Sequence, residues 1–288
     1  ADTALVVGQY LKKILLGAAF LSLALTAQMN AQTQVASNQV MGSTGFYVGV
    51  HGGYNFGIAK DFGRWENRTQ QSGGGWSEEA VGVSYGKGAN VGLDFGYMFN
   101  KNVGVELGVD YLKGGKTEVT EKWNDGETEK YEIYGQMLLV QPKIVIKANP
   151  STITPYAKFG LAIGAMPKTT EDYTSTWNNN VYTEKFEMDG GMAVGVTGAL
   201  GFDYSLNSNM AIFTELRSMA MSYSPKKGTY TEANYNGTSE LNEANGWQYD
   251  DIHYEYVDQV NPGDNTGSST ATKLTKIYDF LHMQTANC

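Results

Sequence analysis

The sequence is poor in the residues that build covalent, metal-binding and nucleic-acid-binding chemistry. Its 288 residues include one cysteine, Cys288, and three histidines. One cysteine excludes an intramolecular disulfide framework and a cysteine-cluster metal site, and three scattered histidines disfavour a histidine-rich one. Lysine and arginine total 21 against 30 acidic residues, for a net charge of −9, which excludes a broad basic footprint for nucleic acid. No metal, cofactor or nucleic acid is therefore expected.

Long apolar runs are also scarce, and the clearest one lies near the N-terminus. Lys12 and Lys13 precede the apolar residues 14–25, and the small residues Ala27 and Ala31 follow. Such a run is too short for the hydrocarbon core of a bilayer, which needs ~20 helical residues. The pattern predicts an exported protein with a signal-peptide helix that is cleaved near Ala31.

The N-terminal pattern also divides the chain. Residues 1–31 are interpreted as upstream residues and signal peptide, with residues 1–10 preceding the peptide itself. Residues 32–44 form a polar linker without a pattern. Residues 45–288 are expected to form the folded domain, which includes a long acidic loop over residues 222–272.

Glycine and tyrosine are abundant, with 35 and 19 residues, and they take part in a regular alternation. Apolar side chains alternate with glycine or polar ones in seven segments, namely 46–58, 88–99, 103–112, 138–146, 156–164, 192–204 and 212–217. This period of two predicts β-strands. A tilted membrane strand requires roughly 9–11 residues, and most segments have this length or slightly more.

The connections between these segments alternate strictly in length. Short ones lie at residues 100–102, 147–154 and 205–209, and long polar ones at residues 59–86, 113–134, 166–190 and 222–272. An outer-membrane barrel has short turns at one rim and long loops at the other. The alternation therefore predicts an up-and-down barrel whose long loops are all extracellular. The following residues are expected to face lipid: Val91, Leu93, Val105, Leu107, Phe159 and Leu161.

Three segments resemble a known family. The sequence Asn30-Ala31-Gln32, the first strand GFYVGV at 45–50 and the segment TPYAKFGL at 154–161 are similar to the outer-membrane β-barrel (porin-like) family common in Bacteroidota. The layout is similar to the eight-stranded OmpA and OmpX barrels. The resemblance implies an all-β, eight-stranded transmembrane barrel in the outer membrane of a Gram-negative cell.

The same resemblance sets expectations for function. It implies a non-enzymatic protein with a structural or surface-interaction role, and a small passive pore for ions or small solutes is the alternative. An envelope lipid-modifying enzyme is the third hypothesis. The expected partners are outer-membrane lipid, the barrel-assembly machinery and an extracellular ligand bound through the loops, with the chain as a monomer.

The C-terminal segment departs from the family. Residues 272–288 do not alternate cleanly and end in cysteine. We expect a short, partial eighth strand near residues 274–281, with residues 283–288 outside the membrane wall. A missing strand would leave unsatisfied backbone groups in lipid, where no water can satisfy them.

Charged residues of both signs occur on the faces opposite the apolar ones, where they would point into the lumen. They are Asp94, Glu106, Asp110, Lys143, Lys158, Asp203, Glu215 and Arg217. Because an unpaired buried charge costs several kcal/mol, we expect these groups to pair in a static network. A gated plug or a small pore is the alternative.

Two further features are weaker. His51 is the one histidine on a predicted strand, near Asn55, and no serine is placed beside it, so no catalytic residue is assigned. Residues 229–272 contain eight acidic residues, no lysine or arginine, and several interleaved aromatic residues. We expect a solvated, mobile acidic loop, and a loop that binds a ligand or divalent cation is the alternative.

Overall fold

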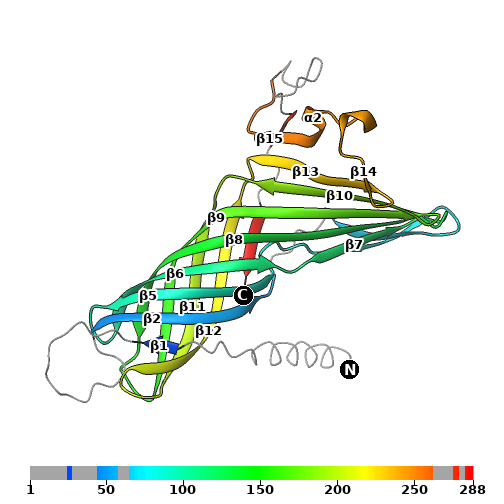
Figure 1. Cartoon of the computed structure of the whole chain (residues 1–288). Coiled ribbons are helices and arrows are strands. Elements are labelled where there is room, and N and C mark those ends of the chain that lie inside the picture. Colours follow the sequence, from blue (N-terminus) through cyan, green and yellow to red (C-terminus); the bar gives the residue numbers. More distant parts are fainter. Residues whose placement is uncertain (1–24, 28–43, 58–64, 262–274, 279–282, 288) are drawn as a thin grey trace, which may run out of the picture.

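The computed structural model describes residues 25–27, 44–57, 65–261, 275–278 and 283–287. The described strands join in one sheet. Its lower part curves into a barrel, and its upper part extends beyond the barrel as a long projection (Figure 1). Among these residues, no helix is long and apolar enough to cross a membrane.

Seven long strands form the barrel wall, and each is antiparallel to its neighbour. In order around the wall they are β2 (Gly45–Asn55), β5 (Gly88–Met98), β6 (Val103–Gly114), β8 (Thr128–Lys147), β9 (Ile153–Trp177), β11 (Ala193–Ser205) and β12 (Met210–Tyr223). Each of the seven segments predicted from alternation coincides with one of these strands, apart from terminal residues at 56–58, 99 and 192, of which residue 58 lies outside the described residues. Short turns join the strands at one rim, called here the turn end, and the other rim is the loop end.

The two faces of the wall differ in the predicted sense. Leu107 is 43% exposed and Phe159 63% exposed, and the other four residues predicted to face lipid are also exposed. Asp94 and Glu106, on the opposite face, are 1% and 3% exposed. Because successive side chains of a strand point to opposite faces, one parity of each strand forms an apolar outer belt and the other fills the lumen.

Aromatic side chains border the outer belt at both rims. At the turn end, the ring of Tyr97 contacts those of Phe46 and Phe99, with centroids 4.7 and 5.5 Å apart. At the loop end, the rings of Tyr54 and Phe56 lie 5.1 Å apart. Two such girdles around an apolar band are typical of barrels that span an outer membrane.

Beyond the loop end, strands β8 and β9 continue into the projection, called here the loop sheet. Its other members are β3 (Glu66–Gln70), β4 (Trp76–Ala80), β7 (Thr117–Lys122), β10 (Asn180–Asp189), β13 (Lys227–Tyr235), β14 (Thr238–Ser239), β15 (His253–Val257) and β16 (Thr275–Tyr278), with the short helices η1 (Glu243–Asn245) and α2 (Tyr249–Ile252). The projection leaves the barrel toward the right of Figure 1.

The loop sheet corrects two expectations. The polar segments 113–134 and 166–190 were expected to be connections, but β7 and β10 pair with the extended β8 and β9 over most of their length. The acidic segment from residue 229 was expected to be a solvated loop, but β13 pairs with β10 and β15 pairs with β13. Threonine and tyrosine are frequent in these segments, and both favour strands.

The barrel is not closed by an eighth strand of full length, so the expected eight-stranded barrel is wrong for the described residues. Between β12 and β2, two short segments lie against β12. At the turn end, β1 (Leu25–Ala27) pairs with residues 210–212 and through Ala27 with Val48. At the loop end, β17 (Met283–Asn287) pairs with residues 219–223. We call the position between β12 and β2 the seam.

The predicted location of the partial strand is also wrong. The expected segment 274–281 contains β16, which pairs in parallel with β15 in the loop sheet rather than with the wall. Residues 283–287, expected outside the wall, pair with β12 instead. The predicted signal-peptide helix mostly lies outside the described residues, and its residues 25–27 form the strand β1. The predicted linker 32–44 also lies outside the described residues, apart from Thr44.

Candidate functional site

The lumen holds a closed ring of eight side chains with alternating charge. In order, the ring runs through Arg217, Glu215, Lys158, Glu106, Lys143, Asp94, His51 and Asp110 and back to Arg217. These side chains come from β2, β5, β6, β8, β9 and β12, so six of the seven wall strands contribute. Seven of the eight charged residues predicted for the lumen belong to this ring.

The ring contacts are all within ion-pair distance. Lys158 Nζ lies 2.9 Å from Glu106 Oε1 and 3.0 Å from Glu215 Oε2. Lys143 Nζ lies 2.9 Å from the same Glu106 oxygen and 3.3 Å from Asp94 Oδ1. Each lysine therefore bridges two carboxylates from different strands. Glu106 and Lys143 are direct partners in the backbone ladder, whereas the other three contacts join strands that the ladder does not pair.

Arg217 completes the cationic side of the ring. Its Nη1 lies 3.1 Å from Asp110 Oδ1, and its Nε lies 3.0 Å from Glu215 Oε1. Gln141 also donates a hydrogen bond of 2.7 Å to the second oxygen of Asp110. The carboxylate of Asp110 is thus surrounded by donors, as a buried charge must be to offset its lost hydration.

His51 is the fourth cation of the ring. Its Nδ1 lies 3.0 Å from Asp94 Oδ2, and its Nε2 lies 2.5 Å from Asp110 Oδ1. A carboxylate oxygen can only accept, so both ring nitrogens must bear hydrogen for both contacts to be favourable. The charge count agrees, because Lys143, Lys158 and Arg217 are three cations against four carboxylates. The imidazolium form of His51 makes the ring neutral.

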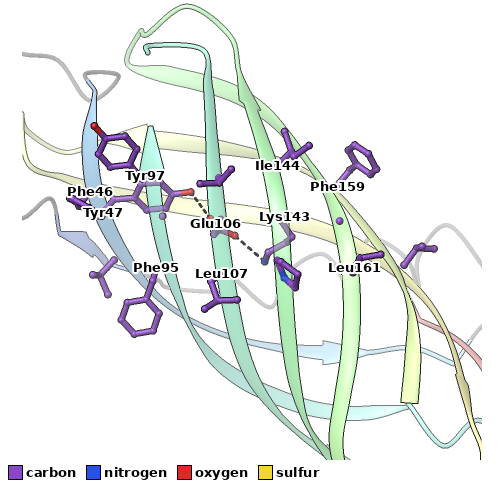
Figure 2. Close-up of a pocket in the computed structure, with 16 residues that line it drawn as sticks. Phe46, Tyr47, Phe95, Tyr97, Glu106, Leu107, Lys143, Ile144, Phe159 and Leu161 are labelled. Atoms are coloured by element: carbon purple, nitrogen blue, oxygen red, sulfur yellow. Dashed lines mark hydrogen bonds and ion pairs between the residues drawn. The ribbon is translucent and has the colours of Figure 1, made fainter. Parts of the chain in front are cut away.

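Two tyrosines and a satellite ion pair surround the ring. Tyr47 donates a hydrogen bond of 2.7 Å to Glu106, and Tyr156 donates one of 3.1 Å to Glu215. Asp203, the eighth predicted residue, is outside the ring and pairs with Lys147 at 2.5 Å. Figure 2 shows the contacts of Tyr47, Glu106 and Lys143 across β2, β6 and β8.

Above the ring, toward the loop end, the lumen is filled by apolar side chains. Val83 and Tyr85, from the segment between β4 and β5, are 4% and 8% exposed and pack inside the mouth. They contact wall and loop-sheet side chains that include Met137 and Met219. This apolar plug comprises Val83, Tyr85, Leu112, Val119, Ile133, Met137, Leu139, Ala162, Met188, Ala193, Met219, Met221, Tyr223 and Tyr256.

Little free volume remains around the ring. One cavity, beside Asp110 and Arg217, has a volume of about 10 Å³, and another, beside Lys158 and Asp203, also has about 10 Å³. A single water molecule needs about this much space. Both cavities are therefore too small for a hydrated ion or a solute.

A much larger hollow, of about 1180 Å³, lies on the outer wall. Exposed apolar side chains such as Phe95, Leu107 and Phe159 line it, and Figure 2 shows them around the inward-pointing Glu106 and Lys143. The hollow lies on the apolar belt and reaches the turn-end girdle, whose Phe46 and Tyr97 also line it. Its lining suits lipid acyl chains.

The described residues contain no group of three or more His, Cys, Asp or Glu side chains arranged to hold a metal ion. His51, the one histidine considered for catalysis, has both ring nitrogens within ion-pair distance of carboxylates. In this arrangement neither nitrogen can act as the base that activates a nucleophile.

Sequence reasoning missed four members of the lumen site, namely Tyr47, Tyr156, Gln141 and Lys147. The signal was present for the first three. Tyr156 and Gln141 have the same strand parity as a predicted lumen charge, and Tyr47 has that of His51. Lys147 was assigned to a turn, but β8 extends to this residue. Polar residues of lumen parity were therefore a better criterion than charge alone.

The chain matches the family described as outer membrane protein beta-barrel domain over residues 18–239. This range covers well over half of the chain, and the chain belongs to that family. It is therefore an integral β-barrel protein of the outer membrane. No curated protein and no solved structure matches the chain.

Proposed function

We propose that this chain is a non-conducting, non-enzymatic outer-membrane barrel that acts as a structural and surface-interaction protein. The observation that carries the proposal is the filled lumen. A neutral ring of eight charges occupies its middle, and an apolar plug occupies its loop end. A water-filled channel requires wide barrels, whereas small ones are filled by side chains.

The proposal includes the orientation of the barrel in the membrane and its route of export. The turn end faces the periplasm, and the loop sheet projects from the cell. The chain is exported by a signal peptide cleaved near Ala31, is inserted by the barrel-assembly machinery, and functions as a monomer. Its source in Bacteroidota and its likeness to OmpA and OmpX belong to the same proposal, supported by the sequence segments that resemble that family.

The small passive pore is the less favoured alternative. For solutes to pass, the apolar plug would have to leave the mouth and the ring would have to open. Breaking a buried ion pair costs about 3–5 kcal/mol, and the residues of the ring are joined by eight contacts. An enzyme is not favoured either, because His51 is held in the ring on both sides.

Planar-bilayer recording tests the proposal. Protein that shows heat-modifiable migration, and is therefore folded as a barrel, is reconstituted beside an open porin as positive control. We expect no unitary conductance steps from this chain, including in Arg217→Ala, which removes two ring contacts but leaves the plug. Regular steps from the wild-type chain, altered in size by Arg217→Ala, would establish a pore and refute the proposal.

A further inference from the structure

The loop sheet has two chemically different faces near its tip. The inner face continues the lumen side of β8, and the outer face continues the outer side of the wall. Tyr131 and Tyr173 are directly paired residues of β8 and β9, so they share the inner face, and their ring centroids lie 4.9 Å apart. Tyr182 of β10 extends this row, with its centroid 6.5 Å from that of Tyr173.

Carboxylates flank the tyrosine row. Glu184 is the direct partner of Tyr173, and Glu129 lies two residues before Tyr131 on the same side of β8. Glu127 accepts a hydrogen bond of 2.8 Å from Ser175, the partner of Glu129. We define the aromatic–acidic face by six residues, all of them partly exposed. They are Glu127, Glu129, Tyr131, Tyr173, Tyr182 and Glu184.

Beyond the barrel, the lysines of β8, β9 and β10 lie on the outer face of the loop sheet, where they are already paired. Lys130 Nζ lies 2.8 Å from Glu132, and Lys168 Nζ lies 2.6 Å from Glu187. Lys116 also pairs with Glu132, and Lys185 pairs with Glu232. The outer face is therefore close to neutral, with cations and carboxylates matched across neighbouring strands.

The aromatic–acidic face lacks such matching. Among the described residues, Glu127, Glu129 and Glu184 form no ion pair with lysine or arginine, although tyrosine or serine hydroxyl groups contact them. Burial raises the pKa of Glu129, and the charges of Glu121 and Glu127 raise it further. The charges that add to the effect of burial on Glu129 are thus those of neighbouring carboxylates.

Beside this face the chain holds a guanidinium with the same kinds of group, at a site that includes Glu121 of β7, the direct partner of Glu129. Arg68 of β3 lies over the ring of Trp76, with 4.5 Å from Cζ to the ring centroid. Its Nε lies 3.2 Å from Glu78, and its Nη1 lies 3.8 Å from Glu121. A ring face and two carboxylates thus surround one cation, which combines a cation–π contact with ion pairing.

We propose that the aromatic–acidic face binds a basic polypeptide segment, with an arginine or lysine side chain held between the Tyr131–Tyr173 pair and the carboxylates of Glu129 and Glu184. The tyrosine row alone would suit either a glycan or a cation, since ring faces stack on both. The unmatched carboxylates favour the cation, and so does the placement of the paired loop-sheet lysines Lys130, Lys168 and Lys185 on the opposite face. The proposal rests on the surface-interaction role and specifies its partner.

Peptide binding to the purified full-length chain in detergent micelles tests this proposal. The probes are a short arginine-rich peptide, its glutamine analogue of equal length, and a neutral oligosaccharide. We expect the arginine peptide alone to bind, with an affinity that falls as salt rises. Affinity should also fall on acidification, beginning at a higher pH than for an ordinary glutamate, because protonation of Glu129 removes the charge that holds the cation.

Matched variants locate the site. Glu129→Gln and Glu184→Gln each remove one negative charge from the aromatic–acidic face and should weaken binding about three- to tenfold. Glu118, which lies 3.2 Å from Lys130 Nζ, and Glu232 are on the outer face. Glu118→Gln and Glu232→Gln make the same change there and should alter affinity less than about twofold. Tyr173→Leu keeps an apolar side chain but removes the ring, and should weaken binding by a similar factor of about three to ten.

The outcomes separate the alternatives. Equal weakening by Glu118→Gln and Glu129→Gln would mean non-specific attraction to a negative protein, and the proposal would be wrong. Binding of the oligosaccharide with no binding of the arginine peptide would identify a carbohydrate surface instead. All variants are first checked for heat-modifiable migration. Conductance is measured in a separate experiment. A failure of peptide binding would therefore refute the peptide site and not the filled barrel, and conductance steps would refute the filled barrel and not the peptide site.

Discussion

The charge ring makes Lys158 the most informative residue to change. Its side chain is 6% exposed, and its ammonium group lies between the side chains of Glu106 and Glu215, which are 1% and 5% exposed. Lys158→Met keeps a side chain of similar length and removes the cation. The ring is then left with one excess negative charge in the middle of the lumen.

The magnitude follows from the distances. At about 3 Å and an effective dielectric constant of about 20, each contact contributes roughly 5–6 kcal/mol of attraction, most of which is offset by the cost of dehydrating the ammonium group. After the substitution, Glu106 retains Lys143 and Tyr47, and Glu215 retains Arg217. The expected net loss of unfolding free energy is therefore about 3–5 kcal/mol, the usual cost of breaking a buried pair.

Urea unfolding in detergent micelles, followed by heat-modifiable migration, measures this loss. Lys101→Met is the matched control, because Lys101 is exposed in the turn after β5, and it should change stability by less than about 0.5 kcal/mol. Lys158→Met combined with Glu215→Gln restores neutrality and should recover about half of the loss or more. If Lys158→Met unfolds at the same urea concentration as the wild type, the ring does not stabilise the barrel.

Four further predictions test the faces, the ring, the orientation and the seam. Leu107→Arg places a charge in the outer belt and should lower stability by about 2–4 kcal/mol; assembly equal to wild type would invalidate the face assignment. His51→Gln leaves Asp94 and Asp110 without the imidazolium between them and should lower the free energy of unfolding by about 3 kcal/mol in the same urea assay. An unchanged free energy of unfolding would contradict the assignment of His51 as an imidazolium. A protease added to intact cells should cleave within residues 229–261 and spare residues 100–102, and cleavage in the turn would reverse the orientation. Thr285→Pro removes a backbone donor from β17 and should reduce the yield of heat-modifiable protein; an unchanged yield would show that β17 does not support the wall.

The sequence was sufficient to predict the barrel wall, and the reason is the period of two. Leu107 and Glu106 are neighbours in the chain, and their parity alone predicted that one would be exposed and the other buried, as they are at 43% and 3%. The lumen charges were found by the same rule. Their partners could not be predicted, since the pair Arg217 and Asp110 depends on the register of strands that are not adjacent.

The loop sheet was missed for a local reason in β9. Met166 has φ 49°, and the pairing with β8 shifts by one residue between Gln136 and Leu138. Such a β-bulge reverses the parity of the strand. Phe159 points outward, whereas Tyr173 shares the inner face. An alternation rule applied across Met166 therefore fails.

The seam shows how the ring and the wall depend on each other. Residues 213–218 of β12 lie between the short segments that pair with it at either end, so the backbone ladder contributes least there. Arg217 and Glu215 lie within that stretch, and His51 lies on β2 at the other side of the seam. The contacts of Arg217 and His51 to the same Asp110 oxygen, at 3.1 and 2.5 Å, therefore hold the two edge strands to one residue of β6. Where a backbone strand is short, side-chain ion pairs hold the barrel edges together, and the same ion pairs fill the lumen.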